Sequence, residues 1–135
     1  MSQKSPSYKY WIPAIFWAAL IFFLSSLSQE ALPKLGIEYE DLAVHFAVYL
    51  VLGYLLAVGL MQPAGRRTLE MSIIAVVLGA LYGASDEFHQ MFVPGRFSAV
   101  SDFIADGLGA LAGVAAFWWF KRPAALIQKS LRLPA

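Results

Sequence analysis

Four long apolar stretches dominate the chain and restrict it to a membrane fold. They cover residues 10–28, 41–61, 69–93 and 99–120. Each is close to the ~20 apolar residues that one transmembrane helix needs. Hydrophobic residues make up 59% of the chain and charged residues only 14%, whereas a soluble domain averages about 25% charged residues. The predicted fold is an all-α membrane protein with four transmembrane helices.

Short connections between these stretches predict antiparallel neighbours and an up-down bundle in a single domain, residues 1–135. Basic residues accumulate on the cytoplasmic side of bacterial membrane proteins. Eight of the ten fall on one predicted side: Lys4, Lys9, Arg66, Arg67, Lys121, Arg122, Lys129 and Arg132. We therefore expect a multi-pass protein of the bacterial cytoplasmic (inner) membrane, with both termini and the basic tail 121–135 in the cytoplasm.

The first stretch has a second interpretation. Its basic start, apolar centre and small residues near "SSLSQEA" resemble a secretory signal peptide. Its length, its aromatic content and the lack of a clear A-x-A cleavage site favour a retained helix. No nucleic-acid-binding motif occurs, and the absence of cysteine excludes thiolate metal sites and disulfides.

Acidic residues show the opposite asymmetry and gather at the outer face. The group contains Glu30, Glu38, Glu40, Asp41, Asp86, Glu87, Asp102 and Asp106. Fourteen uncharged residues separate Asp106 from Lys121. A helix of that length covers about 21 Å, less than the ~30 Å hydrocarbon core. Asp106 is therefore expected below the outer boundary, where an ionisable side chain is costly unless it is paired or hydrated.

Helical spacing predicts that these polar residues face one cavity inside the bundle. Two glycine pairs, Gly79/Gly83 and Gly109/Gly113, predict a close approach of the third and fourth helices. The Pro94-Gly95 turn is expected to bring Arg96 back over the acids, as an anion clamp or as a salt bridge to Asp86, Glu87 or Asp102. The aligned faces comprise Asp41, His45 and Tyr49; Tyr82, Asp86, Glu87, His89 and Gln90; and Ser98, Asp102 and Asp106.

Two motifs, "DLAVHFAVYLVLG" and "LGALYGASDEFHQMFVPGRFSAVSDFIADGLGALAGV", resemble the VanZ-like family across residues 41–114, with a weaker match in "FFLSSLS". The resemblance implies a small polytopic membrane protein linked to resistance to the glycopeptide teicoplanin. By motif position it points to Asp41, His45, Asp86, Glu87, Gln90, Arg96, Asp102 and Asp106. The chain departs from many members in having Leu42 where they have lysine, and Asp106 where they have asparagine.

Three functions remain open. The first is binding or processing of an anionic envelope lipid or lipid-linked precursor head group, with substrate contacts from Asp41, Tyr49, Tyr82, Gln90, Arg96, Ser98 and Asp106. The second is a membrane hydrolase or transferase using His45, Asp86, Glu87 and Asp102, with His45, Asp86 and His89 as candidate ligands of a divalent metal. The third is a small proton-coupled transporter. The aromatic "FWWF" segment, residues 117–120, faces either lipid or a second protomer, so a homodimer is also considered.

Overall fold

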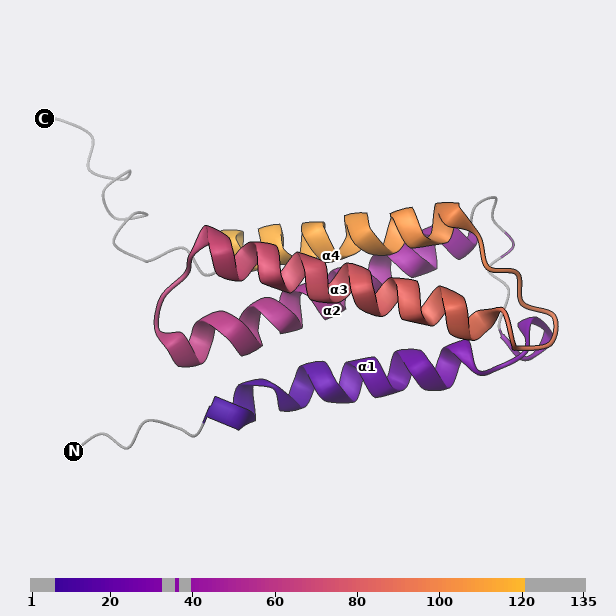
Figure 1. Cartoon of the computed structure of the whole chain (residues 1–135), viewed down its shortest axis with the longest axis horizontal. Helices are drawn as coiled ribbons and strands as arrows, with labels where there is room; N and C mark the ends of the chain where they lie inside the picture. The colour runs from indigo at the N-terminus through magenta and orange to yellow at the C-terminus, as the bar shows by residue number, and fades with distance from the viewer. Residues whose placement is uncertain (1–6, 33–35, 37–39, 121–135) are drawn as a thin grey trace, which may run out of the picture.

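The computed structural model describes residues 7–32, 36 and 40–120, and all regular structure in these residues is helical. Four α-helices are present: α1 (Ile12–Ser25), α2 (Glu40–Ala64), α3 (Leu69–Gln90) and α4 (Val100–Phe120). Two short 3₁₀ helices flank α1, namely η1 (Ser7–Tyr10) and η2 (Gln29–Ala31). The helices run alternately up and down, as predicted (Figure 1). The basic tail 121–135, Lys4, Lys34 and Glu38 lie outside the described residues.

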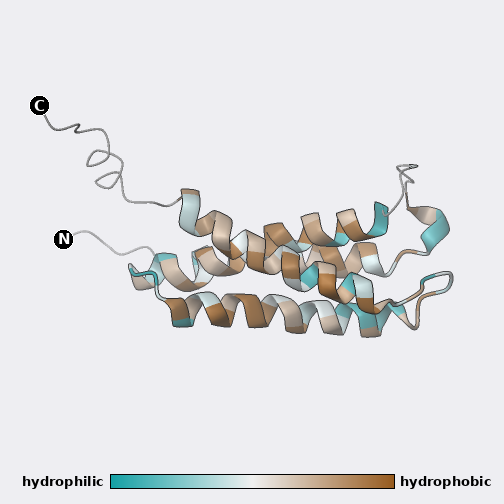
Figure 2. Ribbon diagram, turned by 90° about the horizontal axis from the view of Figure 1, so that it is seen from above, coloured by the Kyte–Doolittle hydropathy of each residue, from teal (hydrophilic) through white to brown (hydrophobic). Residues whose placement is uncertain are grey.

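Three of the helices, α2, α3 and α4, are long and apolar enough to cross a membrane. The first helix is shorter than the predicted span 10–28, with 14 residues, although η1 extends the same segment at its start. Hydrophobic residues dominate the middle of the bundle, and hydrophilic ones gather towards its two ends (Figure 2). This distribution is the one expected of helices that cross a bilayer.

The ends of two helices differ from the prediction. Pro63 lies inside α2, which continues to Ala64 before Gly65 takes a left-handed conformation with φ 63°. A residue with positive φ ends a helix readily when it is glycine. The third helix ends at Gln90 instead of Val93, because the chain already enters turn hydrogen bonds from Phe92 and Val93 to His89 and Gln90.

Glycines set the spacing between helices, but one of the two predicted glycine pairs packs against a different helix from the one expected. Added Cβ atoms on Gly109 and Gly113 would collide with the backbone of α2 at Phe46 and Leu50. The Gly109/Gly113 pair therefore brings α4 against α2, not against α3. Gly53 of α2 makes the reciprocal approach to the backbone of α4. The other pair, Gly79/Gly83, does face α4 as expected.

Below the polar end, the bundle has an apolar core. Its buried side chains include Leu52, Ala57, Met61, Val114 and Phe117. The "FWWF" segment is thus divided: Phe117 is buried, whereas Trp119 and Phe120 are exposed. Trp118 donates a hydrogen bond to Ser72 Oγ over 2.9 Å and so connects α4 to α3.

The first helix lies beside α2 and α3 and is attached to them through side chains (Figure 1). Trp17 Nε1 donates to the Val48 carbonyl at 2.9 Å, and Tyr82 Oη donates to the Ala18 carbonyl at 2.6 Å. These two bonds tie α1 to α2 and to α3 respectively. The remaining space between α1 and α2, at the polar end of the bundle, forms a cavity.

Candidate functional site

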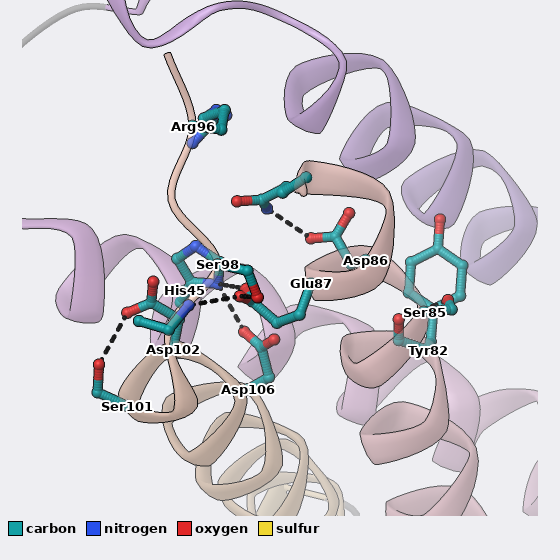
Figure 3. A network of polar contacts seen from close by, with 12 residues as sticks. His45, Tyr82, Ser85, Asp86, Glu87, Arg96, Ser98, Ser101, Asp102 and Asp106 are labelled. Carbon is teal, nitrogen blue, oxygen red and sulfur yellow. Dashed lines mark hydrogen bonds and ion pairs between the residues drawn. The ribbon is translucent and has the colours of Figure 1, made fainter. Parts of the chain in front are cut away.

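The polar site is built where α2, α3 and α4 meet, within two turns of the start of α2, the end of α3 and the start of α4. His45 comes from α2, Glu87 from α3 and Asp106 from α4, and the three side chains point toward one another (Figure 3). His45 Nδ1 is 2.9 Å from Asp106 Oδ1 and 3.8 Å from Glu87 Oε1. Asp106 is completely buried.

Gly83 makes room for Asp106. A Cβ atom added to Gly83 would lie 2.8 Å from Asp106 Oδ2 and 2.9 Å from its Cβ atom. Van der Waals packing does not tolerate contacts this short. Because Gly83 has no side chain, the Asp106 carboxylate of α4 can lie at the centre of the bundle.

Glu87 also holds the start of α4. Its Oε2 atom accepts hydrogen bonds from Ser98 Oγ at 2.8 Å and from the Ala99 backbone N–H at 3.1 Å. The first N–H groups of a helix have no partner within the helix, and a carboxylate is a favourable acceptor there. Ser98 is therefore connected to the site through the hydrogen bond that it donates to Glu87.

Asp86 and Gln90 form a second buried pair, in which Gln90 Nε2 donates to Asp86 Oδ2 over 3.2 Å. Asp102 is buried at the start of α4, with Ser101 Oγ 3.4 Å from its Oδ1 atom. Tyr49 is 1% exposed, and its hydroxyl has no hydrogen-bond partner within the described chain.

A cavity of about 270 Å³ adjoins this cluster between α1 and α2. One part of its wall is apolar, formed by Ile21, Leu24, Leu32, Val44 and Val48. The other part is polar, formed by Gln29, Glu40, Asp41, His45, Tyr49, Asp86 and Arg96. Of the predicted aligned faces, Asp41, His45, Tyr49 and Asp86 line this cavity, whereas Glu87, Asp102 and Asp106 do not. The wall on the α1 side is largely apolar.

Arg96 does not form the salt bridge that was considered with Asp86, Glu87 or Asp102. Instead its Nε and Nη2 atoms donate to the carbonyls of Leu27 and Leu24, at 3.2 and 3.1 Å, and Nη1 donates to Gln29 Oε1 at 3.4 Å. A cation is favourable at the C-terminal end of a helix, where the carbonyl groups lack partners. Arg96 thus fixes the end of α1 while it also lines the cavity.

His89 and Tyr82 lie apart from the central cluster. His89 Nε2 is 3.0 Å from Ser26 Oγ, and its ring stacks on Phe22 at 4.6 Å. Both contacts are with α1 or the residue that caps its C-terminal end, so the expected metal-ligand set of His45, Asp86 and His89 is not brought together. The group that does converge is His45, Glu87 and Asp106.

The chain matches the VanZ/LLP1 family over residues 10–121. It belongs to the VanZ/LLP1 family. This match includes the four α-helices and every residue of the polar cluster. No curated protein and no solved structure matches the chain.

The VanZ/LLP1 match also covers the first helix. The helical pattern of polar residues had not predicted that this helix contributes to the cavity. Ile21, Leu24 and Gln29 line the cavity, and Trp17 joins α1 to α2. The weak similarity of "FFLSSLS", residues 22–28, to the family covers Leu24, whereas Trp17, Ile21 and Gln29 lie outside that stretch. Hydrophobic periodicity carries no signal for these residues, because every face of an apolar helix looks alike in sequence.

Proposed function

We propose that this VanZ/LLP1 membrane protein binds an anionic cell-envelope lipid, or the head group of a lipid-linked precursor, in the cavity between α1 and α2. The observation that carries the proposal is the mixed lining of this cavity. Apolar side chains such as Leu24 and Val44 form one part, and His45, Asp86 and Arg96 form another. A ligand with a polar head and an apolar chain matches both parts.

The size of the cavity restricts how much of such a molecule it encloses. Its volume of about 270 Å³ is near the lower limit of the ~300–1,000 Å³ of typical small-molecule sites. A head group and the adjoining part of a chain fit this volume, and the rest of the chain would continue along the apolar outer surface. Val44 lines the cavity and is 47% exposed, so the rest of the chain would leave the cavity beside it.

Charge in the lining favours a particular kind of head group. Arg96 is the one lysine or arginine in the described wall, which also contains the carboxylates of Glu40, Asp41 and Asp86. Phosphate would bind at Arg96, since guanidinium groups recognise phosphate oxygens. The excess of acids favours a head group that also carries an amine or is accompanied by a divalent cation.

We place the cavity at the extracytoplasmic face of the inner membrane. Arg66 and Arg67 lie in the connection between α2 and α3, at the opposite end of the bundle from His45 and Arg96. Basic loops of membrane proteins remain in the cytoplasm. A site at the outer face is where envelope precursors are assembled, which agrees with the link to teicoplanin that the family resemblance implies.

Native mass spectrometry of gently extracted protein tests lipid binding directly. We expect an anionic phospholipid, added as phosphatidylglycerol, to remain bound to the wild-type chain in preference to phosphatidylcholine. The Val44→Trp substitution fills the apolar part of the cavity and should reduce the bound fraction at least several-fold. The Arg96→Gln substitution should abolish the preference for the anionic lipid.

Ala47→Trp provides the matched control, because Ala47 is exposed on the same helix but does not line the cavity. It should retain lipid at the wild-type level. Equal retention by Val44→Trp and Ala47→Trp would contradict binding in this cavity. The membrane-enzyme and proton-coupled transporter functions stay predictions, as does the homodimer.

A further inference from the structure

Three side chains of the types that commonly bind metal ions converge from three different helices at the polar end of the bundle. His45, Glu87 and Asp106 each offer one ligand atom, and these atoms all lie within 4.8 Å of one another (Figure 3). All three residues are buried or half-buried. Solvated acidic clusters at protein surfaces are common, but this one is enclosed by helices.

Two carboxylate oxygens in the cluster are buried and lack a hydrogen-bond partner among the described residues: Glu87 Oε1 and Asp106 Oδ2. The other oxygen of each group is already used. Glu87 Oε2 accepts from Ser98 and Ala99, and Asp106 Oδ1 contacts His45. Buried polar atoms are almost always satisfied, so an unpartnered pair of acceptors indicates a missing donor or cation.

The charge of the cluster leads to the same conclusion. With both carboxylates ionised and the imidazole neutral, the cluster has a net charge of −2, and no lysine or arginine forms an ion pair with it within residues 7–32, 36 and 40–120. Arg96 is directed to the end of α1. Buried charges require compensation, and one divalent cation would supply it fully.

The spacing of the ligand atoms suits a metal ion. Ligands that bind at about 2.1 Å and subtend 90–110° at the ion lie about 3.0–3.4 Å apart. The distances from His45 Nδ1 to Asp106 Oδ1 and to Glu87 Oε1, 2.9 and 3.8 Å, bracket this range. Small side-chain rotations would bring the three atoms to equal distances from one ion.

We propose that His45, Glu87 and Asp106 bind one divalent transition-metal ion, such as Zn²⁺ or Mn²⁺. An imidazole nitrogen with two carboxylates favours these ions over Ca²⁺ and Mg²⁺, which prefer oxygen ligands alone. Three protein ligands leave at least one coordination position for water or for an external ligand. The site adjoins the α1–α2 cavity through His45, which belongs to both.

Metal analysis and calorimetry of the purified full chain test this site. The protein is prepared without a polyhistidine tag, stripped with EDTA and titrated with Zn²⁺ or Mn²⁺ alone. We expect one ion per wild-type chain and at least ten-fold weaker binding in His45→Ala and Glu87→Gln. Using two variants on different helices, each checked for a monodisperse elution profile, separates loss of the site from loss of the fold.

His89→Ala is the matched control, because it removes the other histidine of the chain and leaves the cluster intact. It should bind the metal like the wild type. X-ray absorption of the zinc-loaded protein should show a single imidazole nitrogen among oxygen ligands. Wild-type protein that binds neither ion, or equal binding by His45→Ala and His89→Ala, would overturn the inference.

Metal binding and lipid binding are separate outcomes. Wild-type protein that retains lipid but binds no metal would overturn the metal site and leave the proposed function intact. Protein that binds metal but shows no lipid preference would overturn the proposed function and leave the metal site intact. If the cluster shares a proton between His45 and Asp106 in place of an ion, Zn²⁺ titration will release no heat above that of the His45→Ala variant.

Discussion

His45 Nδ1 and Asp106 Oδ1 lie 2.9 Å apart, although 61 residues separate them in the chain. This contact joins α2 to α4 at a depth where Asp106 is fully buried. Gly83 of α3 leaves the space for this carboxylate, because a Cβ atom added there would lie 2.8 Å from Asp106 Oδ2. One aspartate is therefore held by three helices, and several properties of the protein depend on it.

Asp106→Ala should lower the free energy of unfolding by about 1–3 kcal/mol, because it leaves His45 without its partner in a buried site. Asp106→Asn retains an oxygen at the same position and should lose less. Unfolding of metal-free protein in mixed micelles provides the measurement. Asp41→Ala, which changes an exposed acid of α2, is the control. Equal stability of Asp106→Ala and wild type would show that the contact contributes nothing.

Gly83→Ala should destabilise the bundle by about 1–3 kcal/mol, since overpacking forces neighbouring side chains or helices to shift. The new methyl group would lie 2.8 Å from Asp106 Oδ2. Gly107→Ala is the matched substitution on α4, where nothing lies within 4 Å of an added Cβ atom. Alanine favours helix more than glycine does, so Gly107→Ala should be neutral or slightly stabilising. The same loss in both variants would contradict the packing argument.

Arg96→Ala should loosen the C-terminal end of α1, because the carbonyls of Leu24 and Leu27 lose the hydrogen bonds that the guanidinium donates. Hydrogen exchange of residues 24–32 should become several-fold faster, and that of α4 should remain unchanged. Lysine has a single ammonium group and cannot reproduce the three directed contacts of the guanidinium, so Arg96→Lys should rescue only partly. Arg66→Ala, at an exposed site in the distant loop, should leave exchange in α1 unaltered.

The predicted orientation can be tested without background labelling, because the chain contains no cysteine. A cysteine at Phe97, which is 89% exposed beside the polar end, should react with an impermeant maleimide in intact cells. A cysteine at Arg66 should react only after the membrane is permeabilised. The reverse pattern would place the cavity on the cytoplasmic side and would contradict a function at the outer face.

The sequence predicted the polar cavity in part. Spacing of four along a helix placed Asp102 with Asp106, and His45 with Asp41, correctly on common faces. It also grouped His89 with Asp86 and Gln90, but His89 turns to Ser26 and Phe22 of α1. A helical face about 100° wide can contact two neighbouring helices, and periodicity does not distinguish between them.

By itself, the sequence determined the number of helices, their alternation and their membrane character, since these depend on the length and polarity of each segment. Tertiary structure alone decided the partners. Gly109 and Gly113 pack on α2, Arg96 binds the end of α1, and Glu87 joins His45 and Asp106. The reason is physical: hydropathy is a sum over local residues, whereas a contact depends on how helices far apart in the chain rotate and pack against one another.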